Sequence, residues 1–265
     1  MSDARLPIKL PTSLKAERHG AVAILRLARA EKRNALDDET VLGIETFFTS
    51  LPDDIGAVLL AGEGEHFSAG LDLSELKERG IAEGIEHSGL WHRAFARIEF
   101  GKAPVVAVLH GAVVGGGLEL AAACHVRVAE RSAFYALPEG SRGIFVGGGG
   151  SVRLPRLIGV ARMADMMLTG RTYSAEEGLS LGLSTYLVDE GAGFAKGLEL
   201  AEHIAGNAPL TNYAITHVLP RIAESDPAAG FAMEAQISAI AQAEGEAKER
   251  LKAFLDKRGP KVVRS

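Results

Sequence analysis

Three adjacent glycines, Gly115 to Gly117, stand between an apolar run and a carboxylate, Glu119. Residues 105–109 are rich in β-branched side chains, which predicts a buried strand. Residues 118–124 are mostly Ala and Leu, which favours a short buried helix. Glycines at this junction would leave free backbone N–H groups at a helix N-terminus, where the helix dipole adds positive potential. The junction is therefore a candidate oxyanion site, with Glu119 as either a helix cap or a catalytic acid or base.

A second segment repeats this order of strand, small residues and helix. Residues 57–60 predict a buried strand, and the segment Phe-Ser-Ala-Gly-Leu-Asp at 67–72 follows after a short glycine-containing loop. Further along the chain, Glu139 precedes a glycine-rich loop at 143–150. Taken alone, Asp72 could cap the helix after it and Glu139 could be a solvated loop residue. Their chemistry depends on what the fold brings together.

The elements that must position these residues alternate between strands and helices over the first two thirds of the chain. Strands are predicted in a hairpin at 17–27 and at 57–60, 105–109, 126–129, 133–136 and 185–188. Helices are predicted after a cap at Asp37 or Asp38 up to Pro52, and at 90–100, 118–124, 151–157, 161–168, 174–181, 194–205, 209–222, 227–243 and 246–257. This order predicts an α/β fold followed by a helical C-terminal region.

The same pattern suggests three divisions of the chain. Residues 1–14 carry prolines and mixed charge and are expected to form a loosely held arm. Residues 15–193 would form the α/β core, and residues 194–265 the helical region. Within the core, Gly80, Gly84 and Gly89 are expected to interrupt regular structure and make that stretch mobile.

The composition is that of an ordinary globular chain, with 265 residues, a net charge of −5 and 47% hydrophobic residues. The absence of a basic excess argues against nucleic acid as a partner. No uninterrupted apolar run reaches about 18 residues and no signal-peptide pattern opens the sequence, so no membrane partner is expected. Cys124 is the single cysteine, which suits a reducing compartment and predicts a cytoplasmic location. No His/Cys/Asp cluster has metal-ligand spacing, so no metal is expected.

Together, residues 105–121, residues 67–72 and the Pro-Glu pair at 138–139 resemble the crotonase (enoyl-CoA hydratase/isomerase) superfamily. Shorter segments at 34–36, 168–170, 175–183 and 253–258 are also similar to that family, so the resemblance spans about residues 20–260. It implies a spiral of repeated ββα turns followed by a C-terminal helical trimerisation region. The implied assembly is a homotrimer or a dimer of trimers.

The resemblance also implies an acyl-coenzyme A thioester as substrate, with no further cofactor. The backbone N–H groups of Leu71 and Gly116 match the family's oxyanion hole, and Glu119 and Glu139 match its two catalytic glutamates. The matching substrate-binding positions are Ala35, Ala69, Asp72 and Gly147, of which Gly147 would help to hold a water molecule. The implied reaction is the reversible addition of water to a 2-enoyl-CoA.

One segment departs from the family pattern. Hydratases usually carry a Thr-Ile-Pro-Gly-like segment after the second glutamate, whereas this chain has Ile-Phe-Val-Gly at 144–147, followed by three more glycines. Loss of the proline and gain of Phe145 should reshape the acyl pocket, which leads to the hypothesis of a bulky or aromatic acyl group.

Other functions remain open from the sequence. A double-bond isomerase could work with one carboxylate near Glu139, and a hydroxycinnamoyl-CoA hydratase-lyase would use the same scaffold. A non-catalytic acyl-CoA or RNA binder would tolerate loss of both glutamates. An RNA binder should also show a stronger basic face than a chain of net charge −5.

Overall fold

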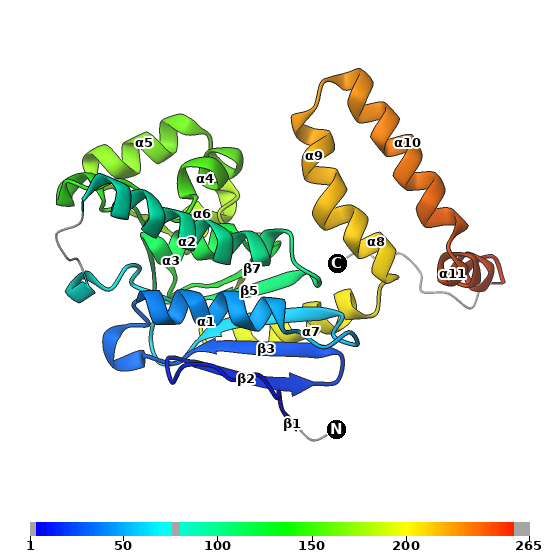
Figure 1. Ribbon diagram of the computed structural model, residues 1–265, viewed down its shortest axis with the longest axis horizontal. Coiled ribbons are helices and arrows are strands. Elements are labelled where there is room, and N and C mark those ends of the chain that lie inside the picture. Colours follow the sequence, from blue (N-terminus) through cyan, green and yellow to red (C-terminus); the bar gives the residue numbers. More distant parts are fainter. Residues whose placement is uncertain (1–3, 76–79, 257–265) are drawn as a thin grey trace. The chain divides into compact units, whose positions relative to one another are not determined.

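The computed structural model describes residues 4–75 and 80–256 (Figure 1). The chain divides into two compact units, residues 1–205 and residues 206–265. All the residues singled out above for chemistry lie in the first unit.

The first unit is built on a seven-stranded sheet in the order β1-β2-β3-β4-β5-β7-β10. Its strands are β1 (Ala4–Arg5), β2 (Leu14–His19), β3 (Val22–Leu27), β4 (Ala57–Gly62), β5 (Val105–Leu109), β7 (Val126–Glu130) and β10 (Tyr186–Val188). The β1-β2 and β2-β3 pairs are antiparallel, and the pairs from β3 to β10 are parallel. All five residues of β5 are buried, as expected for a parallel strand covered on both faces.

A second, smaller layer runs beside the first. The strands β6 (Ala112–Val114) and β8 (Phe134–Ala136) pair in parallel, and β8 pairs antiparallel with β9 (Tyr173–Ser174). Two isolated bridges, Leu36 to Leu71 and Ser68 to Val113, extend this layer. Successive repeats thus give one strand to the large sheet and one extended segment to the small layer, which is the spiral expected above.

Helices cover both faces of the large sheet. They are α1 (Asp38–Thr49), α2 (Ile81–Glu99), α3 (Gly116–Ala122), α4 (Gly150–Ile158), α5 (Val160–Thr169), α6 (Ala175–Leu181) and α7 (Gly193–Ala205). The side chains of Val58 and Leu60 face the core shared with α1 and α2, whereas Leu59 faces the core shared with α7. This alternation follows from the two-residue period of a strand. None of the described helices is long and apolar enough to cross a membrane.

The helix α2 differs from the expectation. It runs without interruption through Gly84 and Gly89, so the predicted interruption of regular structure is wrong for the described residues from Gly80 onward. Gly80 is its N-cap and donates its N–H to the Glu83 carboxylate at 2.9 Å. The buried face of α2 then carries enough apolar contact, through Trp91, Phe95 and others, to outweigh two poor helix formers. Residues 76–79 lie outside the described part of the chain.

The structure also differs from the prediction at both ends of the predicted core, residues 15–193. From residue 4 onward the arm is not loosely held, because β1 pairs with β2 and Leu6 is buried. At the other end, α7 packs on β4 and β5 through small residues, so it belongs to the first unit and the division falls after residue 205 rather than residue 193. A Cβ atom on Gly197 would lie only 2.5 Å from Val108 Cγ2, which shows how closely α7 approaches the sheet.

The second unit is helical, as expected. Its elements are α8 (Pro209–Tyr213), a π-helical turn (Ala214–Val218), α9 (Leu219–Glu224), α10 (Pro227–Ala243) and α11 (Gly245–Leu255). These match the predicted helices at 209–222 and 227–243 closely. The last residue of the predicted helix 246–257 and the final part of the family-like segment 253–258 lie beyond the described residues.

Candidate active site

A cavity of about 180 Å³ in the first unit gathers most of the residues selected from the sequence. Its lining residues are Leu71, His87, Ser88, Trp91, Gly116, Glu119, Glu139, Ile144, Phe145, Val146, Gly147 and Gly148. Four separate segments of the chain therefore meet at one place: the turn after β4, the helix α2, the β6-α3 junction and the loop after β8.

Glu119 lies on the first turn of α3 and is only 3% exposed. Its Oε1 atom accepts hydrogen bonds from the N–H groups of Gly148, at 2.8 Å, and Gly150, at 2.7 Å. Burial raises the pKa of the Glu119 carboxyl, and these backbone donors oppose that rise. The side chain is thus held in one orientation by donors that favour its ionised form.

Glu139 follows β8 and precedes the short 3₁₀ turn Gly140–Arg142. It is 6% exposed, and its Oε2 atom has no hydrogen-bond partner among the described residues. Burial raises the pKa of the Glu139 carboxyl, and the negative charge of Glu119 raises it further. The two carboxylates share one cavity but have different surroundings, since Glu139 lacks the two loop donors that Glu119 has.

Each of the glycines at 148–150 occupies a position where a larger side chain would clash or strain the backbone. A Cβ atom on Gly148 would meet the Trp91 and Phe95 rings at 3.1 Å, and one on Gly150 would meet Glu119 Cγ at 2.7 Å. Gly149 has a φ angle of +95°, which side-chain-bearing residues rarely adopt. The run that looked unusual in the sequence is therefore what allows this loop to close over Glu119.

The backbone N–H groups of Leu71 and Gly116 lie close together at the cavity wall. Gly70 accepts a hydrogen bond from Leu36 N–H and Asp72 donates one to Leu36 O, both at 2.8 Å, so the Leu71 N–H between them points to the opposite side. Gly116 is the first residue of α3, where an N–H has no acceptor within its helix. A Cβ atom on Gly116 would lie 3.4 Å from the Leu71 nitrogen. Two N–H donors can thus be directed at one oxygen atom.

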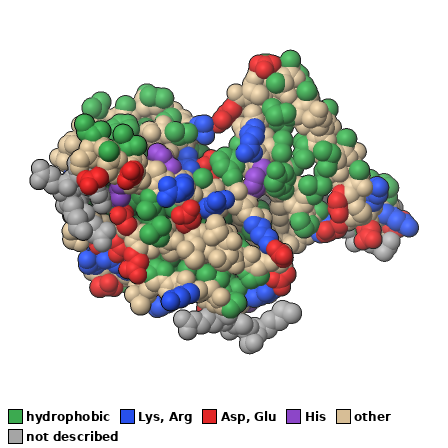
Figure 2. All heavy atoms as spheres, in the orientation of Figure 1, with side chains coloured by type: hydrophobic (Ala, Val, Ile, Leu, Met, Phe, Trp, Pro, Cys, Tyr) green, Lys and Arg blue, Asp and Glu red, His purple; other side chains and the backbone are tan. Residues whose placement is uncertain are grey.

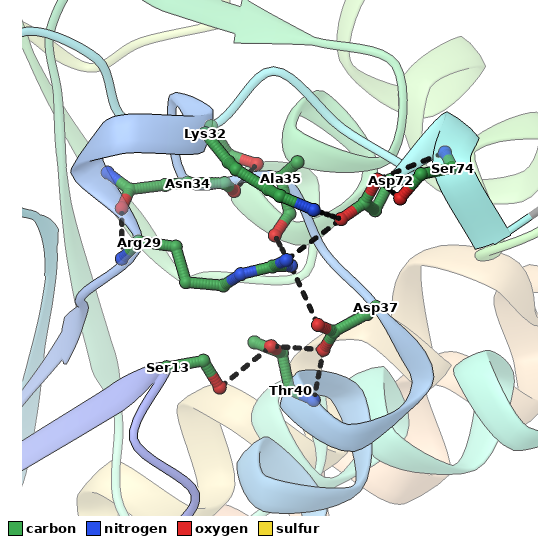
Figure 3. A network of polar contacts seen from close by, with 10 residues as sticks. Ser13, Arg29, Lys32, Asn34, Ala35, Asp37, Thr40, Asp72 and Ser74 are labelled. Atoms are coloured by element: carbon green, nitrogen blue, oxygen red, sulfur yellow. Dashed lines mark hydrogen bonds and ion pairs between the residues drawn. The ribbon is translucent and has the colours of Figure 1, made fainter.

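Three of the predicted substrate-binding residues, Ala35, Ala69 and Asp72, do not line this cavity, whereas Gly147 does. Asp72 is buried in a network of polar contacts with Arg29, Lys32 and Ser74 (Figure 3). Hydrogen bonding by Ser74 and the two cations holds the pKa of the Asp72 carboxyl well below its usual range, although burial opposes this. Its carboxylate is therefore fully occupied within the protein.

The helix α2 contributes three cavity residues that the sequence analysis did not select. They are His87, Ser88 and Trp91. His87 Nε2 lies 2.7 Å from Asp38 Oδ1 at the start of α1. Helical spacing places residues 87, 88 and 91 on one side of α2, which was the available signal, but only the fold shows that this side faces the cavity. The described residues contain no cluster of three or more His, Cys, Asp or Glu side chains that could hold a metal ion.

Comparison with known proteins gives the family. Residues 17–263 match the family model described as enoyl-CoA hydratase/isomerase. The short-chain-enoyl-CoA hydratase of Clostridium acetobutylicum is 31% identical over 245 residues, which cover 91% of this chain and 94% of that protein.

Solved structures agree. A crystal structure from Rhodopseudomonas palustris, of a protein provisionally named enoyl-CoA hydratase, is 56% identical and has a TM-score of 0.92, covering 96% of this chain and 98% of that chain. The crystal structure of an enoyl-CoA hydratase from Bacillus anthracis is 30% identical and has a TM-score of 0.87, covering 94% of this chain and 98% of that chain. The chain with the two buried glutamates described above belongs to the enoyl-CoA hydratase/isomerase family.

Proposed function

We propose that the chain is an enoyl-CoA hydratase in which Glu119 and Glu139 add water reversibly across the double bond of a 2-enoyl-CoA thioester. The observation that carries this proposal is the cavity itself. It brings two buried carboxylates, from α3 and from the loop after β8, beside the N–H groups of Leu71 and Gly116. Relatives that are named as enoyl-CoA hydratases support the same reaction.

In this proposal the thioester carbonyl oxygen accepts hydrogen bonds from Leu71 and Gly116. These donors withdraw electron density from the conjugated system, which makes the β-carbon electrophilic and stabilises the enolate that forms. Removing one donor of this kind costs about 10²- to 10³-fold in rate. Backbone donors suit the task because they are fixed in position before the substrate binds.

The surroundings of the two carboxylates divide the proton transfers between them. Glu119, held by the N–H groups of Gly148 and Gly150, acts as the base that takes a proton from water as its oxygen bonds to the β-carbon. Glu139, whose Oε2 atom has no hydrogen-bond partner among the described residues, gives a proton to the α-carbon. Gly147 would help to hold the water. A proton then passes from Glu119 to Glu139 through solvent, which restores both groups.

The alternatives need less than the cavity supplies. A double-bond isomerase needs one carboxylate, and a binder needs neither, whereas both Glu119 and Glu139 are buried at the cavity despite the free energy that burial of a carboxylate costs. On the face drawn in Figure 2, basic and acidic side chains are interspersed, which does not favour an RNA-binding role. A hydratase-lyase on a hydroxycinnamoyl-CoA would share the first step and is included in the test below.

Phe145 lines the cavity and is 68% exposed, so it is placed to contact a bulky or aromatic acyl group. The reaction would need no cofactor beyond the coenzyme A of its substrate. We further propose fatty acid metabolism as the context, a cytoplasmic location, and a homotrimer or dimer of trimers in which the C-terminal helices take part.

The test is a panel of 2-enoyl-CoA thioesters with short, long and aromatic acyl groups. Turnover is measured as the loss of the conjugated-enone absorbance. Glu119→Gln and Glu139→Gln should each lose most activity. Glu130→Gln is a matched control, because Glu130 is also buried and also accepts a backbone N–H, from Gly193 at 2.9 Å, but lies outside the cavity.

Turnover that survives in both cavity variants would overturn the two-carboxylate mechanism. Preference for the smallest acyl group would refute the bulky-acyl hypothesis alone. Release of an aldehyde from a hydroxycinnamoyl-CoA would identify the lyase, and binding of thioesters without turnover would identify a binder.

A further inference from the structure

Several hydrogen bonds join the turn that carries Leu71 to the loop at 29–37. Ala69 N–H donates to Arg33 O at 2.9 Å, and the Ser68 hydroxyl donates to Asn34 O at 2.8 Å. Leu36 then bonds to Gly70 and Asp72 on either side of Leu71, as described above. The direction of the Leu71 N–H therefore depends on where this loop lies.

The loop itself has an uncommon backbone. Arg33 and Asn34 have φ angles of 53° and 52°, in the left-handed region that residues other than glycine seldom occupy. The Asn34 side chain helps to hold this conformation, since its Nδ2 donates to Glu63 O at 2.8 Å and to His66 O at 2.7 Å. Asn34 thus holds the middle of the loop against the segment at 63–66. The residues that follow it, 35–37, are contacted by a second side chain.

The side chain of Arg29 makes these contacts (Figure 3). Its guanidinium donates to Ala35 O at 2.9 Å and pairs with Asp37 at 2.7 Å and Asp72 at 2.9 Å. The three side chains of this group are largely buried, with 16%, 13% and 8% exposure for Arg29, Asp37 and Asp72. A planar guanidinium can hold several acceptors in fixed directions at once, which an ammonium group cannot do. Arg29 therefore joins the loop backbone at Ala35, the α1 N-cap residue Asp37, and Asp72, which follows Leu71.

We infer that Arg29 is a positioning residue, which acts through Asp72 to hold the Leu71 N–H at the place where the thioester carbonyl oxygen would lie. The inference rests on the proposed function, because it takes the Leu71 N–H to be an oxyanion donor. Such donors must lie about 2.7–3.1 Å from the oxygen to be effective. Movement of Asp72 by a fraction of an ångström would therefore weaken the donor without removing it.

Lys32 provides an internal comparison. Its Nζ contacts the same Asp72 oxygen at 3.1 Å, but its side chain is 48% exposed and has no second carboxylate in this network. If Asp72 needed only a neutralising charge, Lys32 and Arg29 would be equivalent. If the fixed geometry of the network positions Leu71, Arg29 should matter much more than Lys32.

The experiment measures carbonyl polarisation directly. A saturated acyl-CoA with a ¹³C-labelled thioester carbonyl cannot be hydrated, and isotope-edited infrared spectroscopy of its complex reports how strongly the two N–H groups withdraw electron density. The variants are Arg29→Met, Arg29→Lys, Lys32→Met and Asp72→Asn. Arg127→Met is the fold control, because Arg127 is also buried, bonding Leu183 O and Cys124 O, and does not line the cavity.

We expect the wild-type protein and Lys32→Met to show the same lowering of the carbonyl frequency, with Arg127→Met close to them. Arg29→Met and Asp72→Asn should lose much of that lowering, and Arg29→Lys should lie between. The kcat of Arg29→Met should fall about 10- to 100-fold, less than the loss of a whole donor, while the Kd for coenzyme A stays unchanged.

The outcomes separate the two proposals. A wild-type protein that neither polarises the carbonyl nor turns over enoyl-CoA would refute the proposed function. A wild-type protein that does both, with Arg29→Met polarising equally well, would overturn only the role of Arg29. A weaker Kd for coenzyme A with normal polarisation would also overturn it, because Arg29 would then be a ligand-binding residue. If Arg29→Met fails to fold, Arg29→Lys against Lys32→Met decides the same question.

Discussion

The environment of Glu139 has a consequence for the stability of the fold. Because burial and the charge of Glu119 raise the pKa of Glu139, the folded protein resists ionising this group, whereas the unfolded chain ionises it freely above about pH 4.3. This group therefore stabilises the fold fully only below that pH, and its contribution is lost as the pH rises through the folded-state pKa.

Glu139→Gln should accordingly make the protein more stable relative to the wild type as the pH increases. The Gln side chain stays neutral, so the variant escapes the free energy that the wild type spends on ionising or protonating a buried carboxyl. Denaturant unfolding at several pH values between about 5 and 8 measures the difference in the free energy of unfolding between the two proteins. A difference that stays constant or narrows toward pH 8 would contradict the raised pKa.

The glycine loop gives a second prediction at the level of one residue. In Gly150→Ala the new methyl group would lie 2.7 Å from Glu119 Cγ and 2.8 Å from its Oε1, so the carboxylate must move or lose its backbone donors. We expect kcat for enoyl-CoA hydration to fall about 10- to 100-fold, since misplacing a catalytic group is about this costly. Gly84→Ala is the control, because a Cβ there meets nothing within 4 Å. Equal activity of the two variants would refute the steric account.

The helix α2 is the element whose behaviour departs most from its sequence pattern. Its first half contains two glycines and exposed apolar residues, Ile81 and Ile85, and no strong hydrophobic stripe. The stability of α2 comes from its second half, where Trp91, Phe95 and others pack into the core, and from helix propagation toward Gly80. Local pattern could not show this, because the decisive contacts are long-range.

Gly84→Ala tests this view of α2. Gly84 has ordinary helical backbone angles and open space around it, so alanine should fit without strain and reduce the entropy lost on folding. We expect the free energy of unfolding to rise by about 0.5–1 kcal/mol. Chemical denaturation with an unchanged m-value would measure it. A decrease in stability would mean that this glycine is needed for a conformation other than a continuous helix.

At the scale of the whole molecule, buried parallel strands and glycine junctions could be predicted from the sequence, but contacts between distant segments could not. The apolar run of β5 and the turn at Gly115 both have local signatures. The burial of Asp72 by Arg29 joins residues 43 positions apart and has none. Likewise α7 was assigned to the helical region because its period is helical, and only its close approach to Val108 shows that it covers the sheet.

The second unit carries the last prediction. Large apolar side chains are exposed on its helices, among them Leu219 on α9 at 56% and Phe231 on α10 at 71%, and Figure 2 shows such side chains gathered there. Exposed apolar patches of this kind are normally covered in an assembly.

If these helices take part in the proposed homotrimer, Phe231→Glu should shift the protein to a smaller species in light scattering after size-exclusion chromatography. Gln242→Glu adds the same charge to α10 at an exposed polar position and should leave the assembly intact. A wild-type protein that is already monomeric would refute the trimer, and an unchanged mass for Phe231→Glu would place the interface elsewhere.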